Sequence, residues 1–182
     1  MTEELTTGLK ALRQSRGWSL DAAAKATGVS KAMLGQIERG ESSPTLNTLW
    51  KLARGYELSF SQLMAPLTTP AYSGDARLEP ADSGIRVRPL IPFDAQLRSE
   101  LLELELAPGC LRESEAHESG VVEHVIVIGG WLSIFSDGDW HRLGPGDVWR
   151  FNADQPHGYR NDSTEQPAWL HNLIFYPQGR AS

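Results

Sequence analysis

Residues 66–84 divide the chain into two parts. Apolar residues have the spacing of helices in the first part and the pattern of short strands in the second. This segment reads PLTTPAYSGDARLEPADSG and has three prolines but neither a helical nor an alternating pattern, as expected of a linker stiffened by proline. Only one of the 11 prolines, Pro44, precedes it. Because a chain of 182 residues is long enough for two small domains, we predict one domain over 1–65, the linker over 66–84 and a second domain over 85–178.

The first part is predicted to form five short helices. The first spans 7–15, and the other four begin at hydroxyl residues that can cap a helix N-terminus, namely Ser19, Ser30, Thr45 and Ser59. Ser59 and Gln62 also form the S-x-x-Q pattern of a capping box. Gly40 stands where the third helix needs a left-handed C-cap, and the fourth helix is expected to end at Gly55.

The second part has the pattern of a β-barrel. Short runs rich in Val, Ile, Leu and aromatic residues occur at 85–91, 100–107, 122–128, 131–135, 147–151 and 169–176. Residues 136–139, SDGD, predict a hairpin turn. Many short strands without helical segments favour an antiparallel barrel or jelly roll. The expected fold is therefore multidomain, α in the first part and β in the second.

The net charge of −6 is the sum of two unlike parts. Residues 1–66 hold 8 Lys and Arg against 6 Asp and Glu, whereas the remainder holds 9 against 17. A mildly basic part joined to an acidic one suggests a nucleic-acid-binding segment fused to a second function.

Nothing in the sequence indicates secretion or a membrane span. The longest apolar stretch is far shorter than the roughly 20 residues that cross a bilayer, and the N-terminal segment lacks the apolar core of a signal peptide. Cys110 is the single cysteine, so we expect a small buried apolar residue rather than half of a disulfide. A cytoplasmic protein is the expectation.

Residues 19–40 carry the most specific motif of the chain. In SLDAAAKATGVSKAMLGQIERG, Ala24 is small where two helices can approach, Gly28 can adopt the positive φ of a tight turn, and Leu34 lies on the inner face of the second helix. Together with LRQSRGWSL before it and ESSPTLNTL after it, the pattern resembles the phage-repressor-like (Xre-type) helix-turn-helix family over roughly 9–64. The resemblance implies a five-helix domain that binds double-stranded operator DNA.

By that resemblance, the helix that begins after Ser30 enters the major groove of DNA. The candidate base readers are its outward residues Lys31, Ala32, Met33 and Gln36. A glutamine can pair with adenine, a lysine can donate to guanine, and alanine or methionine can contact the methyl group of thymine.

Ser19, Ser30 and Arg39 are the candidate phosphate contacts. The alternative for Lys31 and Arg39 is that they are only solvated helix charges. Glu38 would be repelled by phosphate, so we expect it to pair with Arg13 or Arg16 of the first helix. Because a domain of small positive charge neutralises few phosphates, a homodimer on a two-fold site is expected.

The second part resembles a cupin, a small jelly-roll barrel with a two-part signature, over roughly 85–178. The first part of the signature appears in HESGVVEH, with His117, Ser119 and Glu123 at the ligand positions. The second part appears in GPGDVWRFNADQPHGYRN and supplies His157 and Asn161. One of the four positions that usually hold metal ligands is therefore a serine.

Alternation along 122–128 places Glu123 and His124 on opposite faces of one strand. If Glu123 faces the barrel interior, His117, Glu123 and His157 form the interior polar set. Two interpretations stay open. Two histidines and one carboxylate suit a divalent transition metal such as zinc or iron, and polar residues inside a barrel also suit a pocket for an organic effector.

The other histidines and tryptophans of the barrel are given structural roles. His141 is expected at the surface and His171 within the last strand. The four tryptophans are expected in the barrel core or at a dimer contact; they are Trp131, Trp140, Trp149 and Trp169.

These features together predict a transcriptional regulator that binds DNA and senses a small molecule in its barrel. Among proteins of this architecture, the motifs resemble a small bacterial regulator of sulfur utilisation, which implies genes for sulfur sources as targets. The first alternative is a metal-dependent cupin enzyme, a dioxygenase or isomerase, that carries a DNA-binding domain. Ser119 argues against it, because redox cupins usually have the full three-histidine set. A further alternative is an antitoxin-like partner protein, but the predicted barrel domain argues against this alternative.

Overall fold

The computed structural model describes residues 3–64 and 84–177. Contacts within the chain separate it into two compact units, Met1–Asp82 and Ser83–Ser182. The segment predicted as a linker lies outside the described residues except for Gly84.

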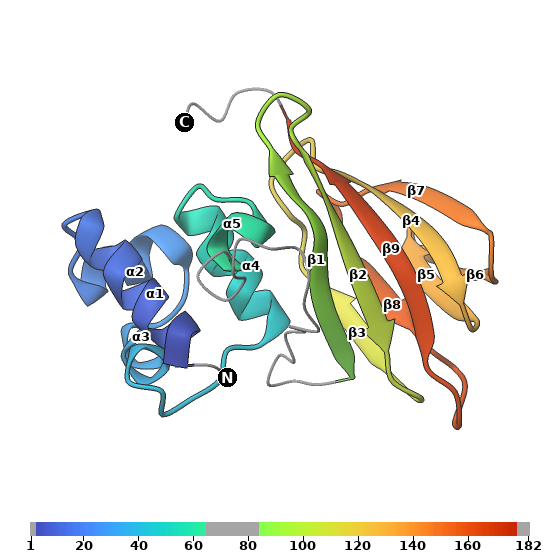
Figure 1. The fold of residues 1–182 in the computed structure, drawn as a ribbon, viewed down its shortest axis with the longest axis horizontal. Helices are drawn as coiled ribbons and strands as arrows, with labels where there is room; N and C mark the ends of the chain where they lie inside the picture. Colours follow the sequence, from blue (N-terminus) through green and yellow to red (C-terminus); the bar gives the residue numbers. More distant parts are fainter. Residues whose placement is uncertain (1–2, 65–83, 178–182) are drawn as a thin grey trace. The chain divides into compact units, whose positions relative to one another are not determined.

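The described part of the first unit is helical. Its helices are α1 (Glu3–Ser15), α2 (Leu20–Thr27), α3 (Lys31–Glu38), α4 (Leu46–Gly55) and α5 (Phe60–Met64) (Figure 1). All five predicted helices are present. Helix α1 begins earlier than predicted, at Glu3 rather than near Thr7, because no helix-breaking residue intervenes and acidic residues are favourable in a first turn.

The hydroxyl caps begin the helices where they were predicted. The Ser19 Oγ accepts a hydrogen bond from the N–H of Ala22 at 3.1 Å, and the Thr45 Oγ1 accepts one from Thr48 at the same distance. At α5 the capping box is reciprocal, because the Ser59 N–H donates to Gln62 at 2.9 Å while the Gln62 N–H donates to the Ser59 hydroxyl at 3.2 Å. Each bond satisfies a backbone donor that a helix end leaves unpaired.

The core of the helical unit is formed by one face of each helix. Its most buried apolar side chains include Leu34, Ile37, Leu49, Leu52, Tyr56 and Phe60. The tightest backbone approach lies between α2 and α4, where a Cβ added to Gly55 would lie 2.5 Å from the Cα of Thr27. Ala24, predicted at the crossing of the two helices of the helix-turn-helix, is half-buried, whereas its neighbour Ala23 is fully buried.

The second unit is an antiparallel two-sheet barrel (Figure 1). One sheet has the order β1-β2-β9-β4-β7 and the other β3-β8-β5-β6. The strands are β1 (Ile85–Asp94), β2 (Ser99–Leu106), β3 (Leu111–Ser114), β4 (Val122–Gly129), β5 (Leu132–Ser136), β6 (Asp139–Leu143), β7 (Val148–Asn152), β8 (His157–Arg160) and β9 (Ala168–Phe175).

Alternation along the strands builds the barrel core. On β4, Glu123, Val125 and Val127 are buried whereas the residues between them are not, which confirms that Glu123 faces inward. The hairpin at 136–139 is also confirmed, since Ser136 pairs with Asp139 while Asp137 and Gly138 have positive φ angles of 54° and 89°. Such angles are those of the tight turns that join antiparallel strands.

Several expectations for single side chains need correction. Trp131 is 55% exposed, which excludes the barrel core but leaves the dimer contact that was the alternative, and the other three tryptophans of the barrel are half-buried. His141 is half-buried rather than fully exposed, and its ring stacks on Trp149 with 4.2 Å between ring centroids. Cys110 is buried and free, as expected.

Candidate DNA interface and barrel site

The turn between α2 and α3 has the geometry of a helix-turn-helix. Gly28 ends α2 with a φ of 72°, and its N–H donates to the carbonyl of Ala24 at 2.9 Å. The hydroxyl of the buried Thr27 accepts from the N–H of Val29 at 3.2 Å, and Ser30 then caps α3 by accepting from Met33 at 3.2 Å. The short turn therefore pairs the N–H groups of Gly28 and Val29 and leads directly into the capped start of α3.

Helix α3 has one buried face and one exposed face. Leu34, Gly35 and Ile37 are buried, whereas the predicted base readers Lys31, Ala32, Met33 and Gln36 are all exposed. Residues three and four apart lie on one side of a helix, so Gln36 shares a face with Ala32 and Met33. The exposed face is the one that could enter a groove of DNA.

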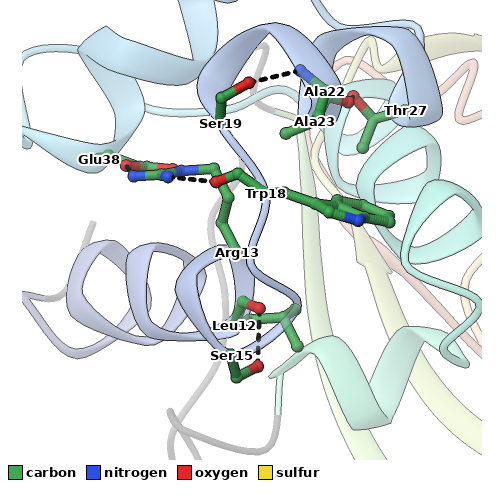
Figure 2. Close-up of polar contacts among 9 residues, drawn as sticks. All are labelled: Leu12, Arg13, Ser15, Trp18, Ser19, Ala22, Ala23, Thr27 and Glu38. Atoms are coloured by element: carbon green, nitrogen blue, oxygen red, sulfur yellow. Dashed lines mark hydrogen bonds and ion pairs between the residues drawn. The ribbon is translucent and has the colours of Figure 1, made fainter.

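A buried ion pair holds α3 to the first helix. Arg13 of α1 donates to both carboxylate oxygens of Glu38, at 2.6 and 2.8 Å, and also to the backbone carbonyl of Trp18 at 2.7 Å (Figure 2). The two side chains are only 13% and 9% exposed. The predicted partner for Glu38 is confirmed as Arg13. Arg16 instead donates to the carbonyl of Tyr56 at 2.8 Å.

The predicted phosphate contacts are all exposed, and each has a local partner. The hydroxyls of Ser19 and Ser30 accept N-cap hydrogen bonds, which leaves each O–H free to donate to another group. Lys31 pairs with Asp21 at 2.7 Å, with both side chains more than half exposed. Arg39 donates to both oxygens of Glu41 at 2.8 and 2.7 Å. Exposed pairs of this kind are worth at most about 1 kcal/mol, so they hold the two basic side chains only weakly.

The barrel interior brings together the three polar residues that the sequence selected. The Nε2 of His117 lies 3.0 Å from Glu123 Oε1, and the Nε2 of His157 lies 3.9 Å from the same oxygen. Their potential ligand atoms all lie within 4.8 Å of one another. The three residues come from the loop before β4, from β4 itself and from the start of β8. Ser119, at the fourth signature position, is exposed.

Two further residues complete the polar interior and were missed from the sequence. The hydroxyl of Tyr159 donates to Glu123 Oε2, and Asn172 Nδ2 donates to the same oxygen at 2.8 Å. Both residues are buried. Tyr159 lies two residues after His157 and so on the same face of β8. Asn172 lies between buried Leu170 and Ile174 on β9, and a polar residue on an otherwise apolar strand face was the available signal.

Burial and hydrogen bonding set the protonation of the site. Burial by itself would raise the pKa of Glu123, but the hydrogen bond with His117, the charges of both histidines and the Tyr159 hydroxyl outweigh it and lower the pKa to about 2. Burial lowers the pKa of His157, and burial together with the Glu123 charge raises that of Tyr159 well above its usual range. At neutral pH the carboxylate is ionised, His157 is uncharged and Tyr159 keeps its proton.

The backbone fixes which nitrogen of His157 carries the proton. Its Nδ1 lies 2.9 Å from the carbonyl oxygen of Gln155, and a carbonyl only accepts, so Nδ1 carries the hydrogen. The Nε2 atom that faces Glu123 therefore presents a lone pair toward an ionised carboxylate. A second acceptor, Asn172 Oδ1, is buried with no hydrogen-bond partner among the described residues. An acceptor-rich interior of this kind suits a cation or a polar ligand.

The donor set fits a divalent transition metal. Two atoms bound to one ion at about 2.1 Å lie roughly 3.0 to 3.4 Å apart in octahedral or tetrahedral coordination. The 3.0 Å separation of His117 Nε2 from Glu123 Oε1 falls in this range, whereas His157 Nε2, at 3.9 Å from the same oxygen, would have to move closer to bind the same ion. The hydrogen bond from His157 to Gln155 is the outer contact that usually orients a metal-binding imidazole. His117, Glu123 and His157 are the residues that could hold the ion.

Comparison with known proteins agrees with the two-part geometry. A helix-turn-helix family model matches residues 9–63, and a cupin-domain model matches residues 102–174. The HTH-type transcriptional regulator SutR of Escherichia coli (strain K12) is 48% identical over 174 residues, which cover 96% of each chain. The chain belongs to the HTH-type transcriptional regulators. It is thus a DNA-binding transcriptional regulator with a cupin domain. The relative that is 48% identical to it is named as a regulator rather than an enzyme.

Solved structures of related HTH-type regulators agree with both halves of the fold. A crystal structure of an HTH_3 family transcriptional regulator from Vibrio cholerae has a TM-score of 0.80 and 42% identity, with 96% of both chains covered. The Cupin_2 domain of an XRE family transcriptional regulator from Enterobacter cloacae has a TM-score of 0.51 and 46% identity, covering 53% of this chain and 100% of that structure. Among the described helices, none is long and apolar enough to cross a membrane.

Proposed function

We propose that the chain binds a two-fold operator as a homodimer through α3 and that its barrel binds a small effector that changes operator affinity. The observation that carries the sensor half is the convergence of His117, Glu123 and His157 in the barrel interior. The DNA half rests on the exposed face of α3, with Lys31, Ala32, Met33 and Gln36 as base readers and Ser19, Ser30 and Arg39 as phosphate contacts.

The proposed dimer follows from the small positive charge of the helical, DNA-binding part. Affinity for DNA grows with the number of phosphates neutralised, and a single helical part with 8 basic and 6 acidic residues neutralises few. Two copies would place two recognition helices in successive major grooves, about 34 Å apart. The acidic barrel would repel DNA and so limit non-specific contact.

In the barrel, His117, Glu123 and His157 would hold a divalent transition metal such as zinc or iron. When bound, the metal would supply an open coordination position for an oxygen or nitrogen atom of the effector. Asn172 and Tyr159 orient the Glu123 carboxylate through hydrogen bonds to its Oε2. This leaves Oε1 directed at the two histidines. An effector that prefers one dimer arrangement shifts operator affinity by the difference in its affinity for the two arrangements.

The resemblance of the motifs to a regulator of sulfur utilisation makes genes for sulfur sources the proposed targets. Mapping of the DNA fragments bound by the purified chain across the genome that encodes it tests this proposal. Enrichment of a two-fold motif beside sulfur-source genes supports it and points to the chemical class of the effector. A two-fold motif beside unrelated genes contradicts the sulfur role alone. The absence of any shared motif contradicts sequence-specific binding.

A further inference from the structure

A hollow lies on the outside of the barrel, away from the three interior residues. Its volume is about 240 Å³, and it lies where the turn after β4, strands β5 and β6 and the loop after β8 meet. The lining residues used below are Trp131, Ser133, Arg142, Asp162 and Pro167.

This hollow is separate from the interior site. Glu123 lies near the start of β4 whereas Gly130 follows its end, and His157 begins β8 whereas Asp162 follows its end. Seven residues of strand span about 20 Å. The two sites therefore occupy opposite ends of the same strands, and no lining residue is shared between them.

One wall of the hollow is an indole with an arginine stacked on it. The guanidinium of Arg142 lies 4.7 Å from the ring centroid of Trp131, and the ring itself is 55% exposed. Gly144 makes room for this ring, because a Cβ added there would lie 2.8 Å from it. Stacking occupies the flat face of a guanidinium but leaves its N–H donors at the edge. No ion pair or hydrogen bond to Arg142 is found within residues 3–64 and 84–177.

The strand beside this wall supplies a second unused donor. Ser133 is paired with Arg142 on β6 and with Arg160 on β8, so the three side chains share one face of the sheet. Ser133 is 2% exposed, and its hydroxyl has no hydrogen-bond partner among the residues that the structure describes. Arg160 is neutralised by Asp162 at 2.8 Å. The hollow therefore contains one uncompensated positive charge and one hydroxyl that can donate a hydrogen bond to a ligand.

The opposite wall is held in place by Asn161. Its Nδ2 donates to the carbonyls of Leu106, Ala107 and Gln166 at 3.1, 3.2 and 2.9 Å, and its Oδ1 accepts from the N–H of Ser163 at 3.0 Å. These bonds fix the loop that carries Asp162 and Pro167. A wall held in this way loses little conformational entropy when a ligand binds.

We propose that this hollow binds a small organic monocarboxylate. The carboxylate accepts hydrogen bonds from the guanidinium of Arg142 and the hydroxyl of Ser133, because a planar guanidinium matches the two oxygens of a carboxylate. The apolar body of the ligand lies against Trp131 and Pro167. The single uncompensated charge favours a monoanion over a dianion such as phosphate, and the exposed indole favours an organic anion over an inorganic one. The site stands independently of the DNA and metal proposals.

Titration of the full-length, ¹⁵N-labelled chain with benzoate tests this site. The indole N–H signal of Trp131, identified by its loss in Trp131→Phe, is expected to shift and to saturate with benzoate. It is expected to move little with the neutral amide benzamide or with inorganic phosphate. Arg142→Gln should weaken benzoate binding by about tenfold or more, because a charge-assisted hydrogen bond is worth about 1.5 to 3 kcal/mol. Arg150→Gln, an exposed arginine on the other sheet, is the matched control and should leave binding unchanged.

A second variant acts without touching a charged group. Gly144→Ala should displace the Trp131 ring and also weaken benzoate binding, while the dispersion of the other amide signals reports that the barrel is folded. The proposal is overturned if benzoate gives no saturable shift, if benzamide or phosphate binds as tightly as benzoate, or if Arg142→Gln binds benzoate like the unchanged chain.

Discussion

Arg13 and Glu38 form a two-point ion pair that joins α1 to the C-terminal end of α3, with N···O distances of 2.6 and 2.8 Å. The guanidinium also reaches the carbonyl of Trp18, in the connection between α1 and α2 (Figure 2). A single side chain thus positions the start of the helix-turn-helix and the end of its second helix. The orientation of α3 depends on this pair as well as on the apolar core.

Arg13→Ala is expected to lower the free energy of unfolding of the helical unit by about 2 kcal/mol, between the values typical of exposed and of fully buried ion pairs. The reason is that Glu38, only 9% exposed, would lose its partner. Urea unfolding followed by circular dichroism at the helix band measures this, since the described helices all lie within residues 3–64. Arg39→Ala, which removes an exposed pair with Glu41, is the control and should change stability by less than about 0.5 kcal/mol. Equal losses for the two variants would contradict the positioning role of Arg13.

Arg39→Ala should instead weaken binding to every DNA sequence and reduce the slope of log affinity against log salt by about one, because one phosphate contact is lost. Fluorescence anisotropy of an operator and of a scrambled duplex over a range of salt concentrations measures both quantities. A loss confined to the operator would show that Arg39 reads a base, and an unchanged slope would show that it stays paired with Glu41.

His117→Ala and His157→Ala should each abolish binding of one equivalent of zinc to the chelator-stripped chain. Each removes one of three donors that lie within 4.8 Å of one another, and three protein donors are about the minimum for a stable transition-metal site. Elemental analysis after dialysis gives the stoichiometry, and calorimetry gives the affinity. His171→Ala, a half-buried histidine outside this cluster, should still bind zinc. Retention of the metal by both cluster variants would leave the organic-effector interpretation in place.

Cys110 should react slowly with a disulfide reagent at pH 8 while the chain is folded. Burial raises the pKa of its thiol and also blocks access, and only the thiolate attacks. Reaction with Ellman's reagent should be at least about tenfold faster in denaturing urea, because unfolding exposes the sulfur and removes the burial that raises its pKa. Equal rates in the two states would show that the side chain is accessible in the folded barrel.

Local chemistry made much of the fold predictable from sequence. Hydroxyl caps at Ser19, Ser30 and Thr45 marked helix starts, because each satisfies backbone donors within its own helix. The Asp137-Gly138 turn likewise identified its hairpin. Strands β3 and β8 were not predicted, because LRES and HGYR have four residues each and little apolar content. They become strands by pairing with each other, and β8 also pairs with β5.

The barrel site, too, could be predicted only in part from local sequence. His117, Glu123 and His157 could be selected because their spacing resembles a known signature. Asn172 lies far along the chain from Glu123, and the two meet only because β9 pairs with β4. The pairing of Arg142 with Ser133 and the stacking of Arg142 on Trp131 also depend on strand register. Contacts of this kind are set by tertiary structure and have no local sequence pattern.

Selection of bound sequences from random DNA, carried out in parallel with the unchanged chain and with Gln36→Ala, tests the central claim most directly. Gln36 lies on the exposed face of α3 beside Ala32 and Met33. The unchanged chain should select a two-fold symmetric motif. Gln36→Ala should select the same motif with relaxed base preference at one position in each half-site, since a good side-chain contact to a base is worth about 1 to 3 kcal/mol of discrimination. An unchanged motif with Gln36→Ala, or no motif with the unchanged chain, would contradict recognition of DNA by this face of α3.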